Sequence, residues 1–224
     1  MLLLRLRWIL TLFALLLWLI AVSTDSWYSL RTPDQGIYVP KKDYFFYKAN
    51  GGLWRVCRTY KMNLTEVRIT KCQYHKLFAS REEVGTNPLM DNTMLDYVRT
   101  QTAFSIISLL LMCMGIGFSV YTFREHRYMF KRLAGGVHFL TAATALVVIE
   151  VLVNSVKYAS ENLKSRIPEG TTWHYGFSFF LGWITFVFYV IAGLAFIICS
   201  RKRKDKVRGT DIHTIADEPH ILGR

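Results

Sequence analysis

The sequence predicts an α-helical membrane protein in which a bundle of four transmembrane helices carries a small extracellular antiparallel β-sheet in its first loop. Three observations predict this fold class. Four long apolar runs divide a 224-residue chain in which 52% of the residues are hydrophobic. Lys and Arg cluster beside the ends of these runs that would lie on one side of a membrane. The long polar segment after the first run is rich in β-branched and aromatic residues, which favour strands.

The apolar runs set the boundaries of the predicted spans. A helix of about 22 residues reaches about 33 Å and therefore covers a hydrocarbon core of about 30 Å. The first run also fits a cleaved signal peptide, because Arg5 and Arg7 precede an apolar stretch that ends in small residues. Either interpretation places the following segment outside the cell. The expected spans lie in residues 1–24, 102–123, 133–153 and 175–199.

The basic residues predict the orientation of the spans. The connection 124–132 carries four Lys or Arg residues, and the tail 200–224 opens with RKRKDKVR. Two spans separate these segments, so both lie on one side, which the positive-inside rule makes cytosolic. The N-terminus joins them, whereas loops 25–101 and 154–174 face outside. We therefore expect a multi-pass plasma-membrane protein with both termini cytosolic.

The net charge of +12 has a simple explanation in this topology. Basic residues beside cytosolic helix ends contact anionic membrane lipid. Membrane lipid is therefore an expected partner, and no nucleic-acid partner is needed to account for the charge.

The first loop, residues 25–101, predicts a sheet. Its segments GIYV, DYFFYK, GLWRVCRTY and EVRITKC are short, rich in strand-forming residues and separated by turn formers. Asn50-Gly51 lies between the second and third segments and is a hairpin signal. Val67 and Ile69 alternate with polar neighbours, which predicts one apolar face that rests on the helix ends.

Two cysteines lie in this loop, where the compartment is oxidising. If Cys57 and Cys72 pair at all, they pair with each other, because both other cysteines lie in the predicted spans. A zinc site with Cys72 and His75 is the alternative, but it lacks two further well-spaced ligands. No metal or cofactor is therefore expected. Asn63-Leu64-Thr65 is a glycosylation sequon in the same loop, so Asn63 is a predicted glycan site.

The order of residues in the first loop resembles a known family signature. A Trp just outside the first span is followed by Gly-Leu-Trp and then by two cysteines. This pattern is similar to the W…GLW…C…C signature of the superfamily of claudins, peripheral myelin protein, epithelial membrane proteins, lens membrane protein and calcium-channel γ subunits. The residues that carry it are Trp27, Gly52, Leu53, Trp54, Cys57 and Cys72.

The resemblance covers nearly the whole chain, because the four-helix layout with a long first loop is also shared. It implies a claudin-like fold. YGFSFFLGW at the last span and IEVLVNSVK at the third resemble γ subunits. The 14 residues between Cys57 and Cys72 exceed the usual claudin spacing. The additional loop cysteines of many γ subunits are not found here.

Two residues of the predicted spans could have special roles. Glu150 is the one acid in the apolar runs. A carboxylate at a helix centre costs about 2.5–3.5 kcal/mol, so Glu150 is a candidate polar site; otherwise it reaches the interface or bonds a neighbouring helix. Cys199, next to basic residues, is a candidate for palmitoylation or a plain buried cysteine. Trp27 and Tyr28 lie beside a predicted helix end and are expected to anchor at the membrane interface.

The sequence offers no constellation for catalysis. It has no phosphate-binding loop, no HExxH motif and no nucleophile with a recognisable base beside it. We therefore expect no enzyme activity. The resemblance to γ subunits implies an auxiliary subunit that binds a pore-forming channel or receptor subunit and modulates its gating or trafficking. The alternative is a junction or adhesion protein that meets a like protein in the same or an opposing membrane.

Overall fold

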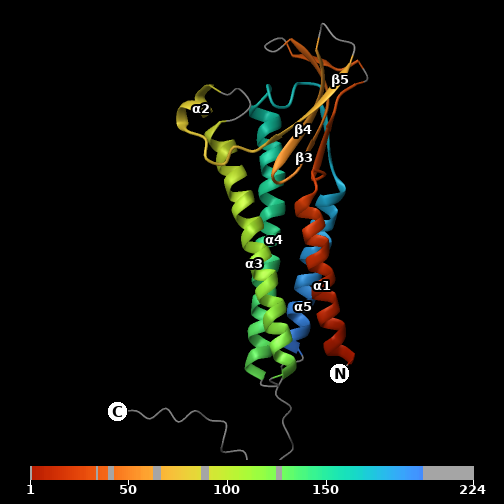
Figure 1. Cartoon of the computed structure of the whole chain (residues 1–224), viewed down its shortest axis with the longest axis vertical. Helices are drawn as coiled ribbons and strands as arrows, with labels where there is room; N and C mark the ends of the chain where they lie inside the picture. The colour runs from red at the N-terminus through yellow and green to blue at the C-terminus, as the bar shows by residue number, and fades with distance from the viewer. Residues whose placement is uncertain are drawn as a thin grey trace, which may run out of the picture.

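The structure is a computed structural model that describes residues 2–33, 35–39, 43–62, 67–86, 91–124 and 128–198. Long helices stand side by side and carry a β-sheet at one end (Figure 1). The helices are α1 Leu2–Ser23, α2 Arg81–Thr86, α3 Asn92–Arg124, α4 Tyr128–Asn162 and α5 Phe177–Ile198. The strands are β1 Tyr28–Arg31, β2 Ile37–Val39, β3 Tyr44–Gly51, β4 Arg55–Met62, β5 Arg68–Tyr74 and β6 Thr172–Tyr175. We call the six-stranded sheet the cap.

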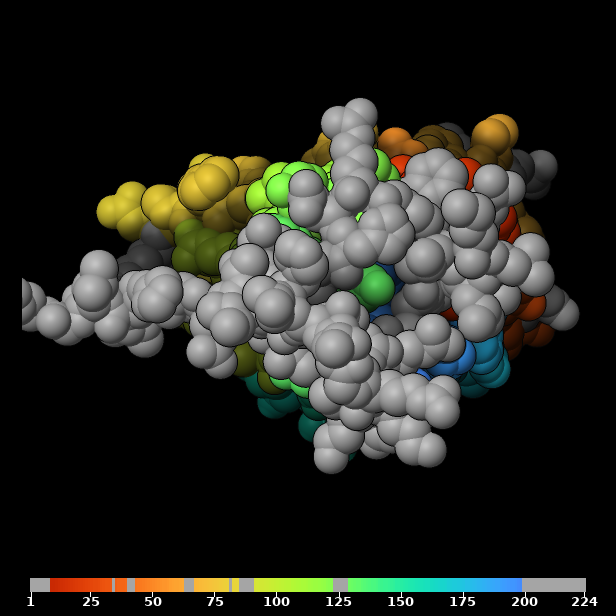
Figure 2. Space-filling view, turned by 90° about the horizontal axis from the view of Figure 1, so that it is seen from below, coloured from red at the N-terminus to blue at the C-terminus, as the bar shows by residue number. Residues whose placement is uncertain are grey.

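The four long helices form the bundle. Helix α1 packs on α5, α5 on α4, and α4 on α3. Seen from the end opposite the cap, yellow-green atoms of α3 lie in the upper part of the view and blue atoms of α5 in the lower part (Figure 2). Of the described helical stretches, three are long and apolar enough to cross a membrane, and Ile9–Ser23 is a shorter apolar stretch. The three are Asn92–Thr122, Met129–Asn162 and Phe177–Ile198. The bundle and the antiparallel cap confirm the predicted fold class.

Helices α3 and α4 are longer than the spans predicted from hydropathy. Helix α3 begins at Asn92 because the carboxylate of Asp91 accepts a hydrogen bond from the Met94 amide at 2.7 Å, which caps the helix. The hydroxyl of Tyr158, near the end of α4, donates to the other oxygen of Asp91 at 2.5 Å. Val98 and Val156 are buried in these added turns. The extensions are therefore packed parts of the bundle.

The cap has the strand order β5-β4-β3-β1-β6, with β2 paired to β3, and every pairing is antiparallel. Strand β6 precedes α5 directly and pairs with β1, so that Tyr175 lies opposite Tyr28. The sequence did not predict this strand, because four residues beside a long apolar run carry little pattern of their own. As a result, both loops contribute to one sheet.

The predicted hairpin turn at Asn50-Gly51 is wrong. Both residues belong to β3 and pair with Cys57 and Val56 of β4. The turn lies between Gly52 and Arg55, where the Gly52 amide donates to the Arg55 carbonyl at 2.9 Å. Gly51 is needed inside the strand because a Cβ there would overlap the ring of Tyr28. Pairing with β1 on its other edge thus overrides the local turn signal.

The predicted apolar face of the segment EVRIT does not rest on the helix ends. Every residue of β5 is exposed. Val67 is 67% exposed and Ile69 is 41% exposed. The reason is that β5 forms one edge of the sheet, whereas β1 and β3 lie in its middle and provide buried side chains such as Leu30 and Phe46.

Close approach of α4 and α5 depends on glycine. A Cβ on Gly135 would lie 3.0 Å from Ile197 Cγ1 and 3.2 Å from the carbonyl oxygen of Gly193. The neighbouring Gly136 has no atom within 4 Å of such a Cβ. A larger side chain therefore fits at Gly136, which faces outward, but not at Gly135, which faces α5.

We predict that Gly135→Leu lowers the free energy of unfolding by about 1–3 kcal/mol, because the added side chain would force α4 and α5 apart. Gly136→Leu is the matched control and should leave stability near that of the unchanged protein. Thermal unfolding of the purified protein in detergent, followed by near-UV circular dichroism, measures both. Equal shifts in the two variants would contradict the packing described here.

Candidate functional site

The family-signature residues of the first loop meet where α1 ends. The last carbonyls of a helix have no partner within it. Here the indole N–H of Trp27 donates to the Ala21 carbonyl at 2.7 Å, and that of Trp54 donates to the Val22 carbonyl at 2.8 Å. Two tryptophans from the cap thus complete the hydrogen bonding of the last turn of α1.

Trp27 is not an interfacial anchor, contrary to the expectation from its position. Its side chain is fully buried, and Tyr28 is only 8% exposed. The Trp27 ring meets that of Trp18 edge to face, with 6.1 Å between ring centroids. Trp18 in turn donates from its indole to Ser108 of α3 at 2.8 Å. A residue predicted to face lipid is therefore part of the core, because its N–H has a partner inside the protein.

Gly52 and Leu53 allow the cap to sit directly on the helix end. A Cβ on Gly52 would lie 2.8 Å from the Cα of Asp25 and 3.0 Å from the carbonyl oxygen of Thr24. Leu53 is fully buried. The Gly-Leu-Trp segment therefore combines a close backbone contact, a buried apolar side chain and a hydrogen-bond donor at Trp54.

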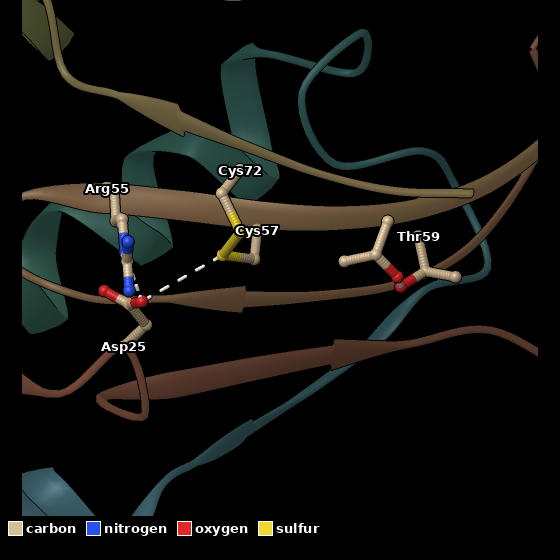
Figure 3. The surroundings of a disulfide bond; sticks show 6 residues. Asp25, Arg55, Cys57, Thr59 and Cys72 are labelled. Atoms are coloured by element: carbon tan, nitrogen blue, oxygen red, sulfur yellow. Dashed lines mark hydrogen bonds and ion pairs between the residues drawn. A yellow bond between two sulfur atoms is a disulfide. The ribbon is translucent and has the colours of Figure 1, made fainter.

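A disulfide and an ion pair hold β4 in place (Figure 3). Cys57 and Cys72 lie opposite each other in β4 and β5 and are joined by a disulfide. The zinc alternative is therefore wrong for Cys72, because its sulfur is already bonded to Cys57. Arg55 Nε donates to Asp25 Oδ2 at 2.5 Å, and the sulfur of Cys57 lies 4.0 Å from the same oxygen. Asp25 thereby links the end of α1 to the bridged strands.

Positive groups gather around His75 at the end of β5. Burial, together with the positive charges of Arg166 and Arg58, lowers the pKa of His75 to about 4. A hydrogen bond with the Gly52 backbone acts in the opposite direction. Burial also lowers the pKa of Arg58, and Arg166 adds to that effect. His75 is therefore neutral at physiological pH.

The remaining predicted residues lie apart from this junction. Glu150 is exposed on the outer face of α4. Asn63 and Cys199 lie outside the described residues, so glycosylation and lipidation stay predictions. Within the described part of the chain, no group of three His, Cys, Asp or Glu residues could hold a metal ion. The junction itself is held together by the two indole hydrogen bonds, the disulfide and the Asp25–Arg55 ion pair.

Sequence reasoning missed the Asp25–Arg55 pair, the capping role of the two indoles and the basic group around His75. The pair joins residues 30 positions apart, and no spacing rule links them. A helix ending in polar residues beside Trp27 was a usable signal, because the last carbonyls of a helix need donors.

We predict that Trp27→Phe lowers the free energy of unfolding by about 1–3 kcal/mol, because the buried Ala21 carbonyl would lose its hydrogen bond of 2.7 Å and keep only the longer one from the Thr24 hydroxyl at 3.2 Å. Trp173→Phe is the control, since the Trp173 indole makes no hydrogen bond within the described residues. Differential scanning fluorimetry of both variants tests this. A Trp27 variant no less stable than the control would argue against the capping role.

We predict that stability falls as pH drops from about 6.5 toward 4. The pKa of His75 is lower in the folded protein than in the unfolded chain, so the unfolded chain binds a proton at a higher pH. Protonation therefore favours the unfolded state as the pH falls. The loss due to His75 reaches up to about 3 kcal/mol. His75→Gln should flatten this part of the profile when unfolding is measured between pH 7.5 and 4.5. An unchanged profile in the variant would exclude His75 as the cause.

Comparison with known proteins agrees with this architecture. The family model described as PMP-22/EMP/MP20/Claudin tight junction matches residues 12–198. Epithelial membrane protein 1 of Homo sapiens is 32% identical over 107 residues, which are 48% of this chain and 63% of that protein. The voltage-dependent calcium channel gamma-5 subunit of Mus musculus is 28% identical over 190 residues, which are 82% of this chain and 65% of that protein. The chain therefore spans under two thirds of the length of these relatives.

Residues 12–198 include the whole cap and most of the bundle, so both the junction at the end of α1 and the helices around it fall within the match. The chain belongs to the PMP-22/EMP/MP20/claudin family of membrane proteins.

Proposed function

We propose that this protein is a non-catalytic auxiliary subunit that associates within one membrane with a pore-forming channel or receptor subunit. It would modulate the gating or trafficking of that subunit, as the name of the gamma-5 relative suggests for voltage-gated calcium channels. We also propose that both termini are cytosolic and that the cap lies outside the cell. The observation that carries the proposal is the position of Glu150.

Glu150 faces outward from the apolar part of the bundle. It belongs to an exposed stripe of α4 that continues with Asn154, Lys157 and Glu161 toward the cap. Its neighbour Ile149 lies 3.4 Å from where a Cβ of Gly182 would be, so Glu150 is level with the interior of the apolar helix α5. Helix α4 continues about three turns beyond Glu150. The carboxylate therefore lies on a surface that would otherwise contact lipid.

An exposed carboxylate at this depth favours a lateral partner. Within the described residues, the Glu150 side chain has no hydrogen bond or ion pair. A charged group among lipid tails is costly unless a donor or a cation pairs with it. A basic or hydrogen-bonding residue on a partner helix would offset that cost. The small residues Ala143 and Gly136 are exposed about two and four turns below on the same side of α4 and would permit close approach of the partner backbone.

Lateral association would change the gating of a channel only if this protein binds the channel's open and closed states with different affinities. A subunit that binds open and closed forms equally shifts nothing. Contacts on two levels, α4 in the membrane and the cap beyond it, give such a subunit two places at which the partner's states can differ. The alignment to the gamma-5 subunit, which covers 82% of the chain, supports this role.

The matched pair Glu150→Gln and Glu161→Gln tests the proposal, because both acids lie on the same exposed stripe at different depths. We expect Glu150→Gln to reduce the amount of calcium-channel pore subunit recovered in a mild-detergent pull-down by about threefold to tenfold, as for one interhelical polar contact. Its effect on whole-cell current should fall in parallel. Glu161→Gln should behave like the unchanged protein.

Two results would contradict the proposal. One is equal recovery with both variants. The other is unchanged current, voltage dependence and surface level across calcium-channel types when the protein is co-expressed.

A junction or adhesion role is the second candidate, and the exposed edge of the cap favours it. Ile69 and Tyr74 of the edge strand β5 are 41% and 68% exposed, and edge strands readily pair with another chain. The description of the matching family model, which names the tight junction, also supports it. Fluorescence imaging of the tagged protein in contacting cells, combined with the same pull-down, separates the two roles. Enrichment of the protein at cell–cell contacts, with no pore subunit recovered in the pull-down, would favour this role over the first.

A further inference from the structure

A polar pocket opens where the cap meets the start of α5. It has a volume of about 390 Å³ and lies between β1, the end of β3, β6 and the first residues of α5. Gly176 brings α5 against β1 here, because its amide donates to the Trp27 carbonyl at 2.9 Å and a Cβ would overlap the Ser26 carbonyl oxygen. The lining residues are Ser26, Tyr28, Ser29, Arg31, Asn50, His174, Tyr175, Gly176 and Phe177.

The lining includes a cation, donors and no carboxylate. Ser29 is the cross-strand neighbour of both Asn50 and His174, and its hydroxyl donates to Asn50 Oδ1 at 3.1 Å. This bond leaves the NH₂ group of Asn50 available as a donor. The guanidinium of Arg31 has no ion pair within the described residues and lies at the exposed end of β1.

A second positive charge stands next to Arg31. Lys48 of β3 is its directly opposite cross-strand partner and is also exposed. Like charges opposite each other destabilise a sheet, and a bound anion between them would remove that penalty. The pocket therefore presents the environment that a phosphate group prefers, because a guanidinium can donate two parallel hydrogen bonds to it.

An apolar stripe leads away from the pocket along α5. Phe177 lines the pocket and is 52% exposed, and exposed apolar side chains then recur every three or four residues down the helix. This spacing places them on one face of α5. The stripe consists of Phe177, Phe180, Ile184, Val187, Ile191, Leu194 and Ile198.

We propose that this pocket binds the phosphate of a phospholipid headgroup from the membrane leaflet on the side of the cap, with the acyl chains along the exposed stripe of α5. Arg31 binds the phosphate, Asn50 and His174 contribute polar contacts to the headgroup, and Phe177 separates the headgroup from the chains. A ligand with both a phosphate and long apolar chains matches the two adjoining surfaces, whereas a free anion would use only the pocket.

The lipid would link β1, β6 and α5 at the membrane boundary. This inference is independent of the auxiliary-subunit proposal, because Glu150 lies on α4 and takes no part in the pocket.

Native mass spectrometry of the purified full-length protein in mild detergent can separate the contributions of phosphate and chains. The three probes are phosphatidylglycerol, diacylglycerol with the same chains, and glycerol 3-phosphate. We expect the unchanged protein to retain phosphatidylglycerol in preference to the other two. Arg31→Gln should weaken phosphatidylglycerol binding by about tenfold, as for the loss of a charge-assisted hydrogen bond.

Two variants complete the design. Lys71→Gln removes the same charge from exposed β5 at the opposite edge of the cap, so binding should stay unchanged. Arg31→Lys keeps the charge but not the two parallel donors, so it should bind phosphatidylglycerol more tightly than Arg31→Gln and less tightly than the unchanged protein. Equal binding by Arg31→Gln and the unchanged protein would overturn the proposal. So would equal retention of diacylglycerol, or displacement of the lipid by equimolar glycerol 3-phosphate.

Discussion

The hydrogen bonds from two tryptophan indoles to the last turn of α1 are the constraint on which the rest of the structure depends. A helix that leaves the membrane exposes carbonyl groups without partners, and here the cap supplies the donors. Trp27 comes from the segment directly after the helix, whereas Trp54 comes from the turn between β3 and β4. Satisfying both carbonyls therefore fixes the cap above α1 at two separate points of its chain.

One apolar core continues from the cap into the bundle. Leu30, Phe46 and Leu53 of the cap belong to the same buried cluster as Ile149 and Leu152 of α4. The disulfide and the Asp25–Arg55 ion pair lie at the rim of this core and hold β4 and β5 to the end of α1. The cap is thus an extension of the helix packing, which explains how a small sheet with two open edges can keep one orientation relative to the membrane.

Hydropathy and composition predicted the helices and the antiparallel sheet, because a run of apolar residues or of β-branched and aromatic residues is a local property. The predictions that were wrong concern residues whose surroundings are set by their position in the assembled structure. The alternation of Val67 and Ile69 is real, but it cannot tell an edge strand from a central one. Asn50-Gly51 is a valid turn signal that pairing with β1 overrides. Trp27 was misplaced at the lipid interface, because its hydrogen-bond acceptor lies inside the fold.

The pairing of β1 with β6 has a consequence for biosynthesis. The Thr172 hydroxyl donates to the Arg31 carbonyl across 141 residues of sequence, so the sheet is completed only after nearly the whole chain has been made. Until then the edge of β1 is open, and an open strand edge can pair with other chains. Long sequence separation also makes such pairing slow. A nascent or truncated chain that ends before β6 therefore exposes an unpaired strand edge on which cellular quality control can act.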